Sequence, residues 1–122
     1  MGLASEVGEV VSEGVNNLCA LLEWNDAGAI EAPPLDCVML KETIDALKEA
    51  MREILHGGRL VGVSPLVTEE ALARLIRLEE LITDWPSIGA LSAEVVTLAE
   101  ACVSALWGGV GWRELMANAR RK

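Results

Sequence analysis

Residues 88–107, IGALSAEVVTLAEACVSALW, form the stretch that most constrains the fold of this chain. Apolar side chains recur along it at spacings of three and four residues, which is the repeat of an α-helix. Further apolar positions widen this stripe to about half of the helix surface, and the charged residues are Glu94 and Glu100. Because a helix this apolar must be covered on most sides, we predict that it is the central helix of a bundle.

The same stretch is also long enough to cross a bilayer, which takes about 20 apolar residues. Such a span would place Glu94 and Glu100 in hydrocarbon, where an ionised carboxylate is costly. No basic cluster precedes the stretch to orient it in a membrane. We therefore expect a buried helix and no membrane contact.

Three other segments show helical periodicity together with start or stop signals. Asp36 is a suitable N-terminal cap for one helix, and Thr68 is the predicted cap of the next. The residue before Pro86 avoids the helical conformation, and the helix that Thr68 begins is therefore expected to end there. The predicted helices cover residues 5–23, 37–55, 68 to the break at 84–86, and 88–107; the predicted loops between them are 24–35 and 58–67.

The end of the chain shows a glycine-rich break followed by a second amphipathic pattern. Gly108, Gly109 and Gly111 are expected to stop the central helix and to act as a hinge. Residues 112–121 then read as a short amphipathic tail helix. We therefore predict one all-α domain, with an antiparallel four-helix bundle over 1–107 and the hinge and tail helix over 108–122.

Composition indicates an aliphatic core in a single cytoplasmic domain. The 122 residues are 52% hydrophobic, but the aromatic residues are four Trp, with no Phe or Tyr. The three cysteines show no CxxC spacing, and the N-terminus lacks the basic and apolar regions of a secretory signal. These features favour reduced thiols inside the cell, without a disulfide framework or a zinc site.

Charge is distributed unevenly along the chain. The net charge is −9, and residues 1–36 contain seven acidic residues with no Lys or Arg. This N-terminal segment repels nucleic-acid phosphates and suits a protein partner with a basic surface, or a basic face of a neighbouring subunit. The alternative is that the charge serves solubility.

Two pairs of acidic residues stand at i,i+3 spacing, Glu6 with Glu9 and Glu42 with Asp45. The words EVGEV and ETIDAL resemble the ExxE…ExxD motifs of the MazG-like all-α nucleotide pyrophosphohydrolases. That resemblance implies that the four acids would bind Mg²⁺ against nucleoside triphosphate phosphates. The alternative is that they are solvated charges, because all four lie opposite the apolar stripes of their helices.

We expect a protein without catalytic residues or a cofactor, because the single histidine and the glycine runs form no catalytic or phosphate-binding pattern. The predicted function is a protein-interaction module: an adaptor, an assembly subunit, an escort or an acidic inhibitor, a profile that fits a phage or mobile-element regulator. The tail helix is expected to dock near the acidic first helix of a neighbouring copy and so form a homo-oligomer. The predicted partner-binding residues are Trp112, Leu115 and Met116 in the tail and Glu6, Glu9 and Glu13 in the first helix.

Overall fold

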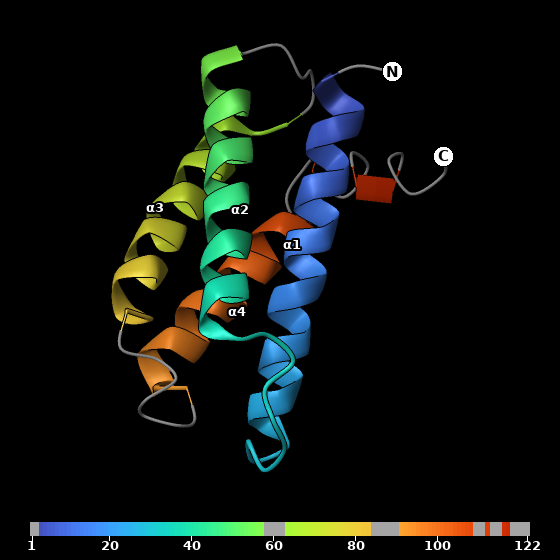
Figure 1. The fold of residues 1–122 in the computed structure, drawn as a ribbon. Helices are drawn as coiled ribbons and strands as arrows, with labels where there is room; N and C mark the ends of the chain where they lie inside the picture. Colours follow the sequence, from blue (N-terminus) through green and yellow to red (C-terminus); the bar gives the residue numbers. More distant parts are fainter. Residues whose placement is uncertain (1–2, 58–62, 84–90, 109–111, 113–115, 118–122) are drawn as a thin grey trace.

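The computed structural model describes residues 3–57, 63–83, 91–108, 112, 116 and 117, with side chains from Val7 onward. This part of the chain forms four helices and contains no strand: α1 Leu3–Asp26, α2 Cys37–Gly57, α3 Pro65–Leu81 and α4 Ala93–Gly108. Successive helices run in opposite directions, and each packs on the next, while α4 also packs on α1 (Figure 1). The predicted all-α four-helix fold is confirmed.

Helix α1 continues past the predicted end at Glu23, so Trp24 belongs to the helix and not to the loop. The helix ends through backbone hydrogen bonds from Gly28 N to Asn25 O at 3.0 Å and from Ala29 N to Trp24 O at 3.1 Å. This pattern is a Schellman motif with glycine at the left-handed position, and Gly28 has φ 97°. The stop signal is therefore Gly28, because the polar residues before it stay within the last helical turn.

Helix α2 begins where the sequence predicted. The backbone N of Met39 donates to Asp36 Oδ1 at 2.7 Å, which is the capping bond expected of an Asp before a helix. His56 lies in the last turn, and the helix ends at Gly57.

The predicted cap of α3 is wrong. Ser64 caps this helix through a hydrogen bond from Val67 N to its Oγ at 3.3 Å, and Pro65 occupies the first turn, where its missing N–H has no helical role. Thr68 is fully buried instead, and its hydroxyl donates to Ser64 O at 2.8 Å. The helix therefore begins at Pro65, before Thr68, the residue that the sequence predicted as its cap.

Helix α4 is shorter than the predicted central helix. Ser92 precedes it and accepts a hydrogen bond from Val95 N at 3.3 Å, while residues 88–90 lie outside the described part. The buried positions of α4 are Val95, Ala99, Cys102 and Leu106. No helix in the described segments is long and apolar enough to cross a membrane.

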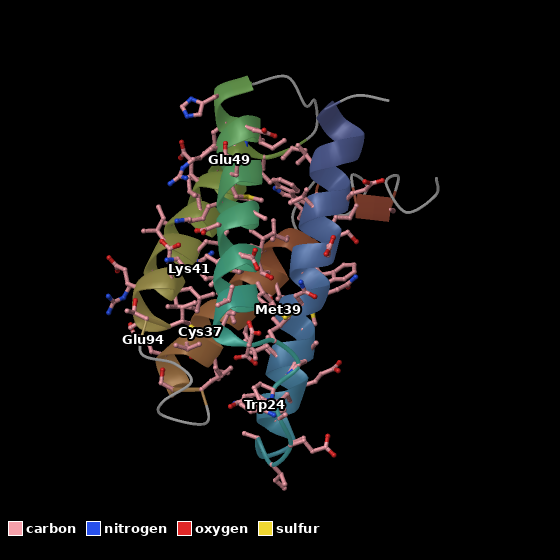
Figure 2. The ribbon with its side chains drawn as sticks, in the orientation of Figure 1. Trp24, Cys37, Met39, Lys41, Glu49 and Glu94 are labelled. Carbon is pink, nitrogen blue, oxygen red and sulfur yellow. The ribbon has the colours of Figure 1, made fainter. Side chains whose placement is uncertain are left out.

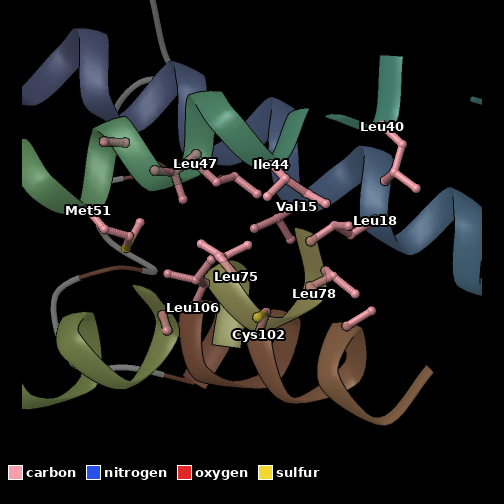
Figure 3. Close-up of a cluster of buried hydrophobic side chains, with 14 of the residues drawn as sticks. Val15, Leu18, Leu40, Ile44, Leu47, Met51, Leu75, Leu78, Cys102 and Leu106 are labelled. Atoms are coloured by element: carbon pink, nitrogen blue, oxygen red, sulfur yellow. The ribbon is translucent and has the colours of Figure 1, made fainter. Parts of the chain in front are cut away.

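The predicted hinge and tail helix fall largely outside the described residues; Trp112 and Met116 are described, and both are buried. With the exception of the Trp112 ring, the buried hydrophobic side chains in the described part are aliphatic or sulfur-containing, as the composition predicted. Figure 3 shows side chains of α1, α2, α3 and α4 meeting in one cluster, including Val15, Ile44, Leu75 and Cys102.

Candidate partner-binding surface

A surface groove of about 300 Å³ lies between α1 and α2. Four residues from each helix line it, each set at the spacing of one helix face: Val10, Glu13, Gly14 and Asn17 from α1, and Met39, Glu42, Thr43 and Ala46 from α2. Val10 is 38% exposed and Met39 is 47% exposed, so both apolar side chains remain accessible in the folded chain.

The groove exists because α1 and α2 approach closely at its floor. Gly14 has no side chain, and a Cβ at this position would lie 2.6 Å from Leu47 Cδ2. At the Asn17 end of the groove, Asn17 Nδ2 donates to Thr43 Oγ1 at 3.3 Å, and that hydroxyl donates to Met39 O at 2.9 Å. The polar atoms at this end therefore bond one another, while the apolar side chains face outward.

Helix α2 separates its charges between two sides. Lys48 Nζ lies 2.8 Å from Glu79 Oε1 on α3 and 3.6 Å from Asp45 Oδ1. The hydrogen bond from Lys48 is the main cause that lowers the pKa of Glu79, and the charge of Lys41 acts in the same direction. Figure 2 shows Lys41 toward α3 and Met39 toward α1. The lysines of α2 thus lie on its α3 side, and the described residues that line the groove include two acids and no base.

A second surface pocket, of about 530 Å³, lies at the C-terminal end of α1. It is lined by Ala20, Glu23, Trp24 and Ala27 on and just after α1 and by Ile30, Glu31, Ala32 and Pro34 in the following loop. Glu13, Asn17, Ala20 and Trp24 follow one another at spacings of four, three and four, so one face of α1 connects the groove with this pocket. The groove and the pocket therefore lie along the same face of α1, and acidic and apolar residues line both.

The described members of the two acidic motifs, Glu9, Glu42 and Asp45, are not gathered into a metal site. Glu42 lines the groove toward α1, whereas Asp45 lies beside Lys48 and Glu79, toward α3. Glu9 is exposed on α1, and the side chain of Glu6 lies outside the described part. Among the described residues, no group of three or more His, Cys, Asp or Glu side chains is placed to hold a metal ion.

The two tail residues whose side chains are described and buried, Trp112 and Met116, are covered within their own chain. The Trp112 indole N–H donates to Thr68 Oγ1 on α3 at 3.2 Å, and the ring is 0% exposed. Met116 is also buried, while Leu115 is outside the described residues. The sequence predicted docking near the first helix of a neighbouring copy, which stays a prediction; the hydrogen bond of Trp112 is to α3 of its own chain. Of the predicted partner-binding residues, Glu9 and Glu13 are exposed, and Glu13 lines the groove.

Sequence reasoning missed Val10, Met39 and Trp24 as surface residues. Val10 and Met39 each stand next to a buried apolar residue, Val11 and Leu40. An apolar side chain one position beside the buried stripe of a helix was the available signal, because it points about 100° away from the stripe. Cys102 has no part in this surface, because it is fully buried in the core; the same burial raises its pKa to about 11.

No protein-family model, curated protein or solved structure matches this chain.

Proposed function

We propose that this chain is a non-catalytic protein-interaction module that binds a basic amphipathic helix of a protein partner in the groove between α1 and α2. The observation that carries the proposal is the groove itself, with accessible Val10 and Met39 beside Glu13 and Glu42. Amphipathic helices bind apolar grooves through residues at i, i+3, i+4 and i+7, and charges along the rim select the partner.

The dimensions of the surface fit such a ligand. Residues 10 to 24 of α1 rise about 21 Å along the helix axis at about 1.5 Å per residue. A partner helix of about 14 residues would cover that length. Its basic residues would face Glu13 and Glu42 on the groove and Glu23 toward the pocket, and its apolar stripe would cover Val10 and Met39.

The test uses an 18-residue helical peptide of Leu, Ala and Lys, titrated into the full chain by calorimetry. We expect Val10→Ser/Met39→Ser to weaken binding by about tenfold or more, since both apolar contacts are removed. The matched control is Leu66→Ser/Ile76→Ser on α3, where both side chains are also exposed. Circular dichroism checks that each variant is folded.

A second pair of variants separates the groove from net charge. Glu13→Lys/Glu42→Lys and Glu69→Lys/Glu100→Lys change the total charge equally, but only the first pair lines the groove. Binding that falls with the first pair and not with the second supports the proposal. Equal loss in both pairs would refute it, because the peptide would then respond only to the overall negative charge.

A further inference from the structure

The pocket at the end of α1 includes an aromatic residue, Trp24, whereas the lining of the groove has none. The residues that line it include Trp24, two acidic residues, Glu23 and Glu31, and Ile30, which is 87% exposed. Its volume of about 530 Å³ lies in the range of sites that take a small ligand or a large side chain. Figure 2 shows Trp24 at the lower end of α1, beside the loop that follows this helix.

Hydrogen bonds fix the wall that the loop contributes. Gly28 and Ala29 both have positive φ, 97° and 56°, so the chain reverses sharply after α1. The loop then returns over the helix, where the Trp24 indole Nε1 donates to Glu31 O at 2.7 Å. This bond holds the indole and Glu31 on the same pocket, and Asn25 Oδ1 accepts from Leu91 N at 3.1 Å to anchor the last turn of α1 to the segment before α4.

We infer that this pocket binds the guanidinium group of an arginine side chain presented by the protein partner. A planar cation stacks on an indole face, and its N–H groups bond carboxylate oxygens in a fixed fork. The methyl groups of Ala20, Ala27 and Ala32 line the same pocket and suit the aliphatic part of an arginine side chain. A lysine ammonium carries the same charge but lacks the flat face, so arginine is the better match.

The inference rests on the proposed function, because the arginine belongs to the helix that occupies the groove. Gly14 lies on the groove floor, and Trp24 lies ten residues farther along α1, or about 15 Å. A partner helix parallel or antiparallel to α1 would therefore place its arginine about ten residues from the small or apolar residue that packs over Gly14. The sequence of a candidate partner can be searched for this spacing.

The test uses N-acetyl-arginine amide as the probe and does not need the partner. The indole N–H signals of the ¹⁵N-labelled full chain are followed by NMR during titration, with the isosteric but neutral N-acetyl-citrulline amide as the control ligand. We expect a saturable shift of the Trp24 signal with the arginine probe, in the millimolar range or weaker. Glu23→Gln/Glu31→Gln should weaken it about tenfold, while Glu69→Gln/Glu100→Gln leaves it unchanged.

Three results would overturn the inference: no response at Trp24, an equal response to the citrulline probe, or an equal loss in both pairs of Gln variants. The Trp107 and Trp112 signals serve as internal references. If the Leu, Ala and Lys peptide binds the groove but the Trp24 signal does not shift with the arginine probe, the arginine inference is wrong and the proposed function stands. If Trp24 binds the probe while the groove variants bind the peptide normally, the proposed function is wrong and the pocket stands as a guanidinium site.

Discussion

Replacing Gly14 by alanine tests the close approach of α1 and α2 that forms the groove. The added Cβ would lie 2.6, 2.7 and 2.9 Å from three carbon atoms of Leu47, whereas carbon atoms in contact are normally about 3.5–4.0 Å apart. Leu47 is fully buried and the overlap includes its branch carbon, so rotating a methyl group out of the way does not relieve it. Either the helices separate or the Leu47 side chain leaves its rotamer.

The expected magnitude is the difference between two opposing effects. Overpacking a core costs about 1–3 kcal/mol, and the overlap with three atoms places Gly14→Ala near the upper value. Alanine in place of glycine within a helix contributes about 1 kcal/mol in favour of the folded state. We therefore expect a net loss of about 2 kcal/mol, which lowers the melting temperature by roughly 6–10 °C in a domain of this size.

Urea unfolding followed by circular dichroism measures this loss, and Gly108→Ala is the matched control. Gly108 also lies in a helix, but a Cβ there meets nothing within 4 Å, so alanine should be neutral or slightly stabilising. In a Leu47→Ala background, Gly14→Ala should become neutral or stabilising, because the new methyl group enters space that the leucine has vacated. Equal stability of Gly14→Ala and Gly108→Ala would refute the close approach and the origin of the groove.

Three further predictions concern separate parts of the fold. Gly28→Ala should destabilise the chain by about 1–2 kcal/mol in urea unfolding, because a left-handed φ is strained for alanine. Cys102, whose pKa is raised to about 11, should react with a thiol reagent at pH 8 far more slowly than Cys19, as mass spectrometry of single-cysteine variants would measure. Lys48 is the main cause of the lowered pKa of Glu79. The stability that this pair contributes is therefore fully present above the unfolded pKa near 4.5 and is lost as the pH falls through the lower folded pKa. Glu79→Gln should reduce the urea midpoint at pH 7 more than at pH 3.

The helices were predictable because their signals are local. The apolar stripes and the Asp36 cap each depend on residues within a few positions, and these defined α2 almost to the residue. Thr68 misled the prediction because its chemistry suits a cap equally well, and the choice of Ser64 depends on Pro65 fitting the first turn. The buried Thr68 hydroxyl accepts a hydrogen bond from the Trp112 N–H instead. The two residues are 44 positions apart, so local sequence signals do not predict this contact.

The groove could not be predicted in the same way, because it depends on how two helices pack. In sequence terms Gly14 only weakens α1, but in the structure it permits the approach of Leu47. Leu98 shows the same limit: it shares the apolar repeat of three and four residues with Val95 and Cys102, yet it is half-buried while Ala99 beside it is almost fully buried. On a helix that is apolar around most of its surface, periodicity does not identify the face that neighbouring helices will cover.

The last prediction concerns the tail, which the sequence assigned to exchange between subunits. Trp112 and Met116 are 0% and 1% exposed within their own chain, and truncating such residues costs about 3–5 and 2–5 kcal/mol. A chain that ends at Gly108 loses both, which approaches the whole stability of about 5–15 kcal/mol for a small domain. We therefore expect the truncated chain to lose most of its helical signal and its cooperative melting in circular dichroism.

Trp112→Phe provides a finer variant of the same test. It retains most of the buried ring but removes the donor that meets Thr68 Oγ1, so we expect a loss of about 1–2 kcal/mol, from the hydrogen bond and the smaller ring. Light scattering on the full-length chain and on the chain that ends at Gly108 shows whether the tail stabilises its own bundle or joins two subunits. If truncation instead converts an oligomer to a monomer while the helical signal and the melting temperature stay the same, the tail serves the contact between subunits and its burial within the chain does not stabilise the bundle.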